Sequence, residues 1–144
     1  MKPPTCLLLA RLAIALVVIW NIQCAFAFLF WPVRFAARFE LSSASGEAAV
    51  RGVGLLFLMW NIPYAVALIH PLRHRISLFE ATAMQAIGLL GETLILISLP
   101  PGHGILYASL MRFIIFDGAG LVLLLLAIWF VHRAALPGSS NRML

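Results

Sequence analysis

The sequence predicts an all-α membrane protein: a bundle of four transmembrane helices with a short interfacial helix between the first two spans. Of its 144 residues, 63% are hydrophobic and 10% are charged, and the mean hydropathy is +1.04. Soluble domains carry about 25% charged residues. Four apolar runs are each long enough to cross a bilayer: residues 6–30, 50–69, 78–99 and 105–131. Little chain remains outside them, so we expect one integral membrane domain, residues 1–144, without a soluble catalytic domain.

The chain between the first two spans has the pattern of a helix that lies on a membrane surface. Span one ends at Trp31 and Pro32, an aromatic residue typical of the membrane interface followed by a helix breaker. Arg34 and Arg38 then fall on one side of a short helix over residues 33–41, with two phenylalanines at the same spacing. The lipid bilayer is therefore the first partner that the sequence predicts.

The formal net charge of +5 comes from basic residues at the ends of the spans, so we expect no nucleic acid partner. Arg73 and Arg75 separate spans two and three, and Lys2, Arg133 and Arg142 flank the first and last spans. Because basic residues favour the inner side of a membrane, we predict that both termini are inside. The expected compartment is a prokaryotic-type plasma membrane.

Three ionisable residues, Glu92, Arg112 and Asp117, lie inside the last two apolar runs. A charge at this depth is costly, so it usually faces protein or water and has a partner. The turn between these runs is centred near residue 102, and Glu92 and Arg112 are each ten residues from it. Both therefore lie roughly 15 Å from the turn, near the middle of the bilayer. We predict an ion pair between Glu92 and Arg112.

Span three carries one stripe of small and polar residues. Ala81, Gln85, Gly88 and Glu92 are spaced by four, three and four residues, which places them on one face of a helix. The other side is aliphatic and suits lipid, with Ile87, Leu90, Leu94 and Ile97. Because small residues let helices approach closely in membranes, we expect Gln85 and Glu92 to point into the bundle.

Asp117 needs a partner of its own. It lies five residues after Arg112, so the two side chains diverge by roughly 140° around the helix and cannot share one groove. Three polar side chains of other spans are the candidate partners: Asn21, Asn61 and Gln85. With Glu92 and Arg112, these residues form the predicted polar network.

Spans one and two share a pattern offset by 40 residues. Arg11 and Asn21 recur as Arg51 and Asn61, with each asparagine between Trp and Ile. Successive spans run in opposite directions, so a true repeat would be inverted, as in transporters with sites near the midplane. The alternative is chance agreement between two apolar segments. Asn61 is of further interest because Pro63 leaves a carbonyl of the preceding turn without its helical donor.

Local signals predict where several helices begin. Ser45 or Gly46 can cap the helix of span two. Ser77 and Glu80 fit a capping box at the start of span three. The prolines and glycines between 100 and 104 predict a tight turn between spans three and four.

No pattern in the sequence supports catalysis or a metal site. Cys6 and Cys24 fall at different depths of one helix, too far apart for a disulfide and without metal-ligand spacing. Ser109 near Arg112 has no matching arrangement of His and Asp. We therefore predict no catalytic residues and no metal ligands, and the identity of any cofactor stays open.

Three functions fit these features. The first is structural: the polar network locks the helices in register, within a larger complex or homo-oligomer, because interhelical hydrogen bonds average only about 0.6 kcal/mol and specify more than they stabilise. The second is binding or transport of an ion, a proton or a small ligand by Glu92 and Arg112, although no polar face is long enough to line a water pathway. The third is an accessory redox subunit, since His70 and His132 end spans two and four on the same side and paired imidazoles can ligate haem.

The segment Gly88-Leu89-Leu90-Gly91-Glu92-Thr93-Leu94-Ile95-Leu96 resembles the Gly-Glu segment of small DoxX-like four-helix membrane proteins. The stretch Arg51-Gly52-Val53-Gly54 at the opening of a span is similar to related families of uncharacterised function. The resemblance covers these two stretches, and the Gly-Glu segment falls in the third span, later than the family pattern has it. It implies a four-helix architecture. Some relatives accompany quinone-linked redox enzymes, so it also favours redox chemistry without assigning a cofactor.

Overall fold

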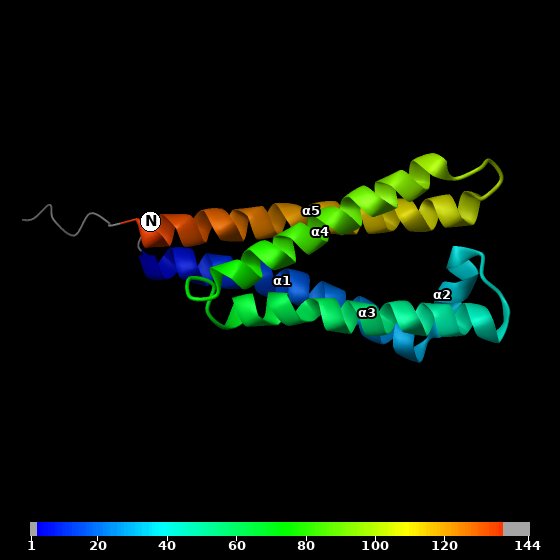
Figure 1. The fold of residues 1–144 in the computed structure, drawn as a ribbon, viewed down its shortest axis with the longest axis horizontal. Coiled ribbons are helices and arrows are strands. Elements are labelled where there is room, and N and C mark those ends of the chain that lie inside the picture. The colour runs from blue at the N-terminus through cyan, green and yellow to red at the C-terminus, as the bar shows by residue number, and fades with distance from the viewer. Residues whose placement is uncertain (1–2, 137–144) are drawn as a thin grey trace, which may run out of the picture.

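The computed structural model describes residues 3–136, which form four long helices joined by short connections (Figure 1). Within that range every regular element is a helix: α1 (Pro3–Phe30), α2 (Pro32–Ala36), the 3-10 helix η1 (Ala37–Phe39), α3 (Ser43–Ile69), α4 (Arg75–Ser98) and α5 (Gly104–Ala135). The four long helices are each long and apolar enough to cross a membrane. The predicted all-α fold with a short helix between the first two candidate spans is confirmed. Lys2 and Arg142, which contributed to the predicted orientation, lie outside the described residues.

α1 packs against both α3 and α5, and α4 is the helix that is inclined to the others (Figure 1). Arg11 Nε, near the start of α1, donates to the carbonyl of Leu68, near the end of α3, at 3.2 Å. These two helices are therefore antiparallel. α4 contacts α3 and α5, and the turn after Ser98 leads it back into α5 as the sequence predicts.

α3 begins at Ser43, before the apolar run of residues 50–69. Hydropathy does not detect this extension because residues 43–49 are small or polar. None of them is a proline, so they can still form a helix. The predicted cap is wrong: Ser42 is the N-cap, without a side-chain hydrogen bond, instead of Ser45 or Gly46. The Ser45 hydroxyl lies 3.0 Å from that of Ser43, so it is engaged locally instead.

The capping box predicted at the start of α4 is also wrong. His74 is the N-cap, so Ser77 and Glu80 lie inside the helix already. The backbone explains the earlier start. The His74 N–H donates to the His70 carbonyl at 2.9 Å, and the His74 carbonyl accepts from the Leu78 N–H at 3.2 Å. A tight turn therefore runs directly into the helix, and no serine cap is needed.

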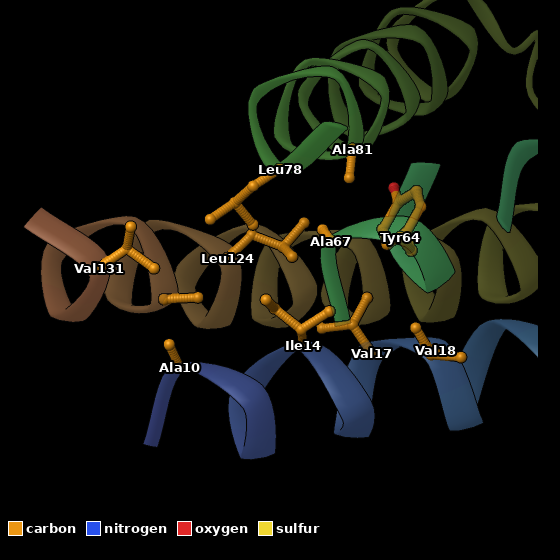
Figure 2. Packing of buried hydrophobic residues seen from close by; sticks show 11 residues of the cluster. Ala10, Ile14, Val17, Val18, Tyr64, Ala67, Leu78, Ala81, Leu124 and Val131 are labelled. Carbon is orange, nitrogen blue, oxygen red and sulfur yellow. The ribbon is translucent and has the colours of Figure 1, made fainter. Parts of the chain in front are cut away.

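A largely aliphatic core, with one tyrosine, fills the part of the bundle where α1 starts and α5 ends (Figure 2). Its buried residues come from all four long helices: Ala10, Ile14, Val17, Val18, Tyr64, Ala67, Leu78, Ala81, Leu124, Ala127 and Val131. Ile14 and Leu124 are fully enclosed. The alanines among them let the backbones approach closely, which is how helices associate in membranes.

An aromatic cluster around Phe28 holds the α2–η1 segment against the long helices. The Phe28 ring centroid lies 4.8 Å from that of Phe35 and between 5.9 and 6.0 Å from those of Phe39, Phe57 and Phe113. Aromatic pairs at these separations attract each other. The five rings come from α1, α2, η1, α3 and α5. The short helix is thus packed onto three long helices.

The two faces predicted for α4 are confirmed. Ala81 is fully buried and Gln85 is 4% exposed. The aliphatic side is turned outward, with exposed fractions between 64% and 76% at Ile87, Leu90, Leu94 and Ile97. An outward apolar face of this size suits a lipid environment.

Candidate functional site

A polar cavity of about 80 Å³ lies between the four long helices. Each long helix contributes at least one of its lining residues: Asn21, Phe57, Trp60, Asn61, Tyr64, Met84, Gln85, Gly88, Glu92 and Asp117. Five of the six predicted network residues are among them. This polar cavity is the candidate functional site.

Gln85 joins two helices to α4 through its side-chain amide. The Tyr64 hydroxyl of α3 donates to Gln85 Oε1 at 2.8 Å. Gln85 Nε2 donates to Asp117 Oδ1 of α5 at 2.8 Å. Of the three partners considered for Asp117, the structure therefore selects Gln85. We call this chain of Tyr64, Gln85 and Asp117 the polar clamp.

Two glycines make room for the polar clamp. A Cβ added at Gly88 would collide with Asp117 Oδ2, and one added at Gly120 would lie 2.7 Å from Gln85 Nε2. Real Cβ atoms do not tolerate such contacts. Gly88, one of the small residues predicted to allow close helix approach, and Gly120 thus leave room for side chains that cross between α4 and α5.

Two oxygen atoms in the polar cavity lack a hydrogen-bond partner among the described residues: Asn61 Oδ1 and Glu92 Oε2. Both atoms are buried, and both residues line the cavity. Asn61 Nδ2 is occupied, because it donates to the Phe57 carbonyl one turn earlier at 2.7 Å. This hydrogen bond holds the Asn61 amide in place and leaves Oδ1 as its unpaired acceptor within the described residues. Buried acceptors of this kind call for an explanation, since most buried polar atoms are paired.

Asn21 completes the lining from α1. Asn21 and Asn61 are each 5% exposed. Both line the polar cavity, so the two asparagines of the offset pattern lie at one site. The antiparallel packing of α1 on α3 produces this meeting. The inverted repeat itself stays a prediction.

The predicted ion pair between Glu92 and Arg112 is wrong. In residues 3–136, the only ion pairs are Arg51 with Glu47 and His103 with Glu40. Arg112 Nε donates to the Ala108 carbonyl at 3.1 Å, within its own helix. Arg112 therefore does not belong to the polar cavity.

Helix rotation explains why the pair does not form. Equal distance from the turn gives Glu92 and Arg112 similar depth, but it does not say which face of α5 meets α4. Arg112 and Asp117 diverge by roughly 140° around α5. Because Asp117 is the residue that faces Gln85, Arg112 is turned away toward η1.

The titratable groups with the lowest ordinary pKa values in the polar cavity are two carboxyl groups. The cavity lining includes the carboxyl groups of Glu92 and Asp117 and, among the described residues, no Lys or Arg. Within the same part of the chain, no three His, Cys, Asp or Glu side chains gather as metal ligands would. Aromatic rings of Phe57 and Trp60 form another part of the wall. Carboxylates, amide oxygens and aromatic faces together suit a small monovalent cation.

Sequence reasoning missed Tyr64, Trp60 and Phe57. The signal was present, since Phe57, Trp60 and Tyr64 follow one another at intervals of three and four residues, on the same side of α3 as the neighbouring Asn61. A buried Tyr needs a partner for its hydroxyl, which here is Gln85.

The terminal histidines have separate surroundings. His70 Nδ1 accepts a hydrogen bond from the Arg73 N–H at 3.2 Å and so helps close the turn before α4. His132 lines a hollow with residues of α4, including Arg75 and Leu78.

Comparison of the chain with protein-family models, curated proteins and solved structures finds no match.

Proposed function

We propose that this chain is a non-enzymatic integral membrane protein that binds a small monovalent cation, such as a protonated amine, in its polar cavity. The four long apolar helices support insertion in a membrane. Arg73, Arg75 and Arg133 support an orientation with both termini inside. A plasma membrane of the prokaryotic type is the compartment that we propose with it.

One observation carries the proposal: the buried oxygens Glu92 Oε2 and Asn61 Oδ1, which lack a partner among the described residues, belong to two residues that line the same cavity. A network that serves packing alone normally satisfies its buried polar atoms. A binding site leaves acceptors for the ligand. Since both are oxygens that accept hydrogen bonds, the matching ligand is a donor, and the two nearby carboxyl groups favour one with positive charge.

Different parts of the cavity have different tasks in this proposal. The polar clamp holds Asp117 in place and links α3, α4 and α5. Glu92 and Asn61 then offer oxygens to the N–H groups of the cation. Trp60 adds an aromatic face, which attracts a cation by about 0.5–2 kcal/mol. The volume of about 80 Å³ restricts the ligand to a small one.

Isothermal titration of the purified protein with methylammonium chloride tests the proposal. We expect Glu92→Gln to weaken binding by about tenfold or more, because a charge-assisted hydrogen bond contributes about 1.5–3 kcal/mol. Glu80→Gln is the matched control, since Glu80 is exposed on the same helix, and it should bind as the unaltered chain does. Circular dichroism checks that both variants remain helical. Equal binding by the Glu92→Gln protein, or no binding by the unaltered chain, would contradict the proposal.

The structural function is the second candidate, and the polar clamp favours it. Its three side chains satisfy one another across three helices, which is how a register-setting network is built. It accounts for Gln85 and Asp117 but not for the free oxygens of Glu92 and Asn61. Assembly into a homo-oligomer or a larger membrane complex is compatible with either function. An accessory redox role, which the resemblance to DoxX-like proteins implies, likewise stays a proposal.

A further inference from the structure

Arg112, displaced from the polar cavity, lines a second cavity of about 80 Å³ where the α2–η1 segment meets α5. The lining of this second cavity combines two arginines, a serine and three aromatic rings: Phe35, Arg38, Phe39, Ser109, Arg112 and Phe113. No Asp or Glu is among these described lining residues. We call it the basic cavity.

Ser109 fixes the two sides of the basic cavity relative to each other. Its hydroxyl donates to the Arg38 carbonyl at 2.7 Å and so joins α5 to η1. Arg112 reaches the same hydroxyl oxygen with one guanidinium nitrogen at 3.4 Å. On the other side, the Arg38 guanidinium lies over the Phe35 ring, 5.4 Å from its centroid. Both guanidinium groups are thus positioned by contacts within the protein.

Among the described residues, both guanidinium groups keep a positive charge without a carboxylate partner and N–H groups that are free to donate. Within residues 3–136 neither Arg38 nor Arg112 forms an ion pair. The carboxylate nearest to Arg38 along the chain, Glu40, is occupied by His103 and by the Leu106 N–H, and the one nearest to Arg112, Asp117, accepts from Gln85. An arginine in a candidate membrane span without a carboxylate partner is costly, so an anion from outside the chain is the natural complement.

We propose that the basic cavity binds a phosphate group through Arg38 and Arg112. Guanidinium groups match the oxygens of phosphate with paired N–H donors, and Arg is favoured over Lys for this reason. The short α2–η1 segment is of the kind that lies at a membrane surface, at the level of lipid phosphates. Arg112 is eight residues into α5, roughly 12 Å from its start, and its long side chain can extend toward that level. The phosphate belongs to an anionic lipid headgroup or to a phosphate ion from solution.

Native mass spectrometry of the purified chain, with mixed phosphatidylglycerol and phosphatidylcholine, tests the lipid source. We expect preferential retention of phosphatidylglycerol, reduced about tenfold in the R38Q/R112Q variant. R34Q is the matched control, because Arg34 is exposed on the same segment and lines neither cavity. It should retain the lipid as the unaltered chain does.

A thermal melt with inorganic phosphate, against chloride at equal ionic strength, tests the solution source. If phosphate raises the Tm of the unaltered chain but not of R38Q/R112Q, and mass spectrometry shows no preference for phosphatidylglycerol, the site binds free phosphate. If R38Q/R112Q equals the unaltered chain in both measurements, the proposal is overturned. If that variant does not fold, R112Q alone decides, since its side-chain bonds stay within one turn of α5. Unchanged retention and Tm response in R112Q would likewise overturn it.

Discussion

At the scale of single residues, the two carboxyl groups of the polar cavity differ in their partners. Asp117 accepts a hydrogen bond from Gln85 Nε2, whereas Glu92 Oε2 has no partner in the described part of the chain. The same functional group, a carboxyl, therefore has two different environments within one cavity. Asp117 belongs to the polar clamp, and Glu92 is available to a ligand.

The polar clamp depends on the missing side chain of Gly88. We expect Gly88→Ala to lower the free energy of unfolding by about 1–3 kcal/mol, the usual cost of overpacking, because its Cβ would collide with Asp117 Oδ2. Denaturant titration of the detergent-solubilised protein measures this change. Gly91→Ala is the control on the same helix, since nothing lies within 4 Å of a Cβ there. It should be neutral or slightly stabilising, as Ala favours helix over Gly. Equal effects of the two substitutions would contradict the packing argument.

At the scale of elements, the α2–η1 segment is tied to the start of α5 by Glu40. Its carboxylate contacts His103 Nδ1 and accepts from the Leu106 N–H at 3.2 Å. Glu40 has a φ of 56°, in the left-handed region, which turns the chain from η1 toward α3. The contact thus joins the C-cap residue of η1 to the N-cap residue and first turn of α5.

We expect this contact to make the α2–η1 segment sensitive to acid. The hydrogen bond with His103 holds the pKa of the Glu40 carboxyl below its ordinary value of 4.5. A carboxyl whose pKa is lowered by folding stabilises the folded state above its ordinary pKa and loses that effect as the pH falls through the lowered one. We therefore expect hydrogen exchange at Leu106 to accelerate as the pH drops below about 4.5, relative to unstructured amides. Glu40→Gln should lack this step, and Glu47→Gln, whose partner is Arg51, should retain it. A step that persists in Glu40→Gln would refute the assignment.

At the scale of the whole molecule, the proposed orientation predicts which turns are accessible from outside a cell. In a background with Cys6 and Cys24 replaced by Ala, we expect Gly102→Cys to react with a membrane-impermeant maleimide. His74→Cys should react only after the membrane is opened, because the turn around it is placed inside by Arg73 and its neighbours. Mass spectrometry of the labelled protein gives the result. The reverse labelling pattern would reverse the orientation.

Several features of the fold could be read from the sequence. Hydropathy located four helices because a bilayer requires long apolar runs. Periodicity along residues 81–92 identified the buried face of α4 because side chains three and four apart share a side of a helix. The same rule separated Arg112 from Asp117, and it placed Gln85 among the candidate partners of Asp117.

The sequence by itself thus determined the number of long helices, the buried stripe of α4 and most residues of the polar cavity. Only the tertiary structure decided that Asp117 meets Gln85, that Arg112 turns to η1, and that Glu92 keeps a free oxygen. The reason is geometric. Spacing fixes where a side chain lies around its own helix, but the rotation of one helix against another is set by all their contacts together. These contacts include the close approaches of Asp117 to Gly88 and of Gln85 to Gly120, and the packing of the Phe28 ring against Phe113.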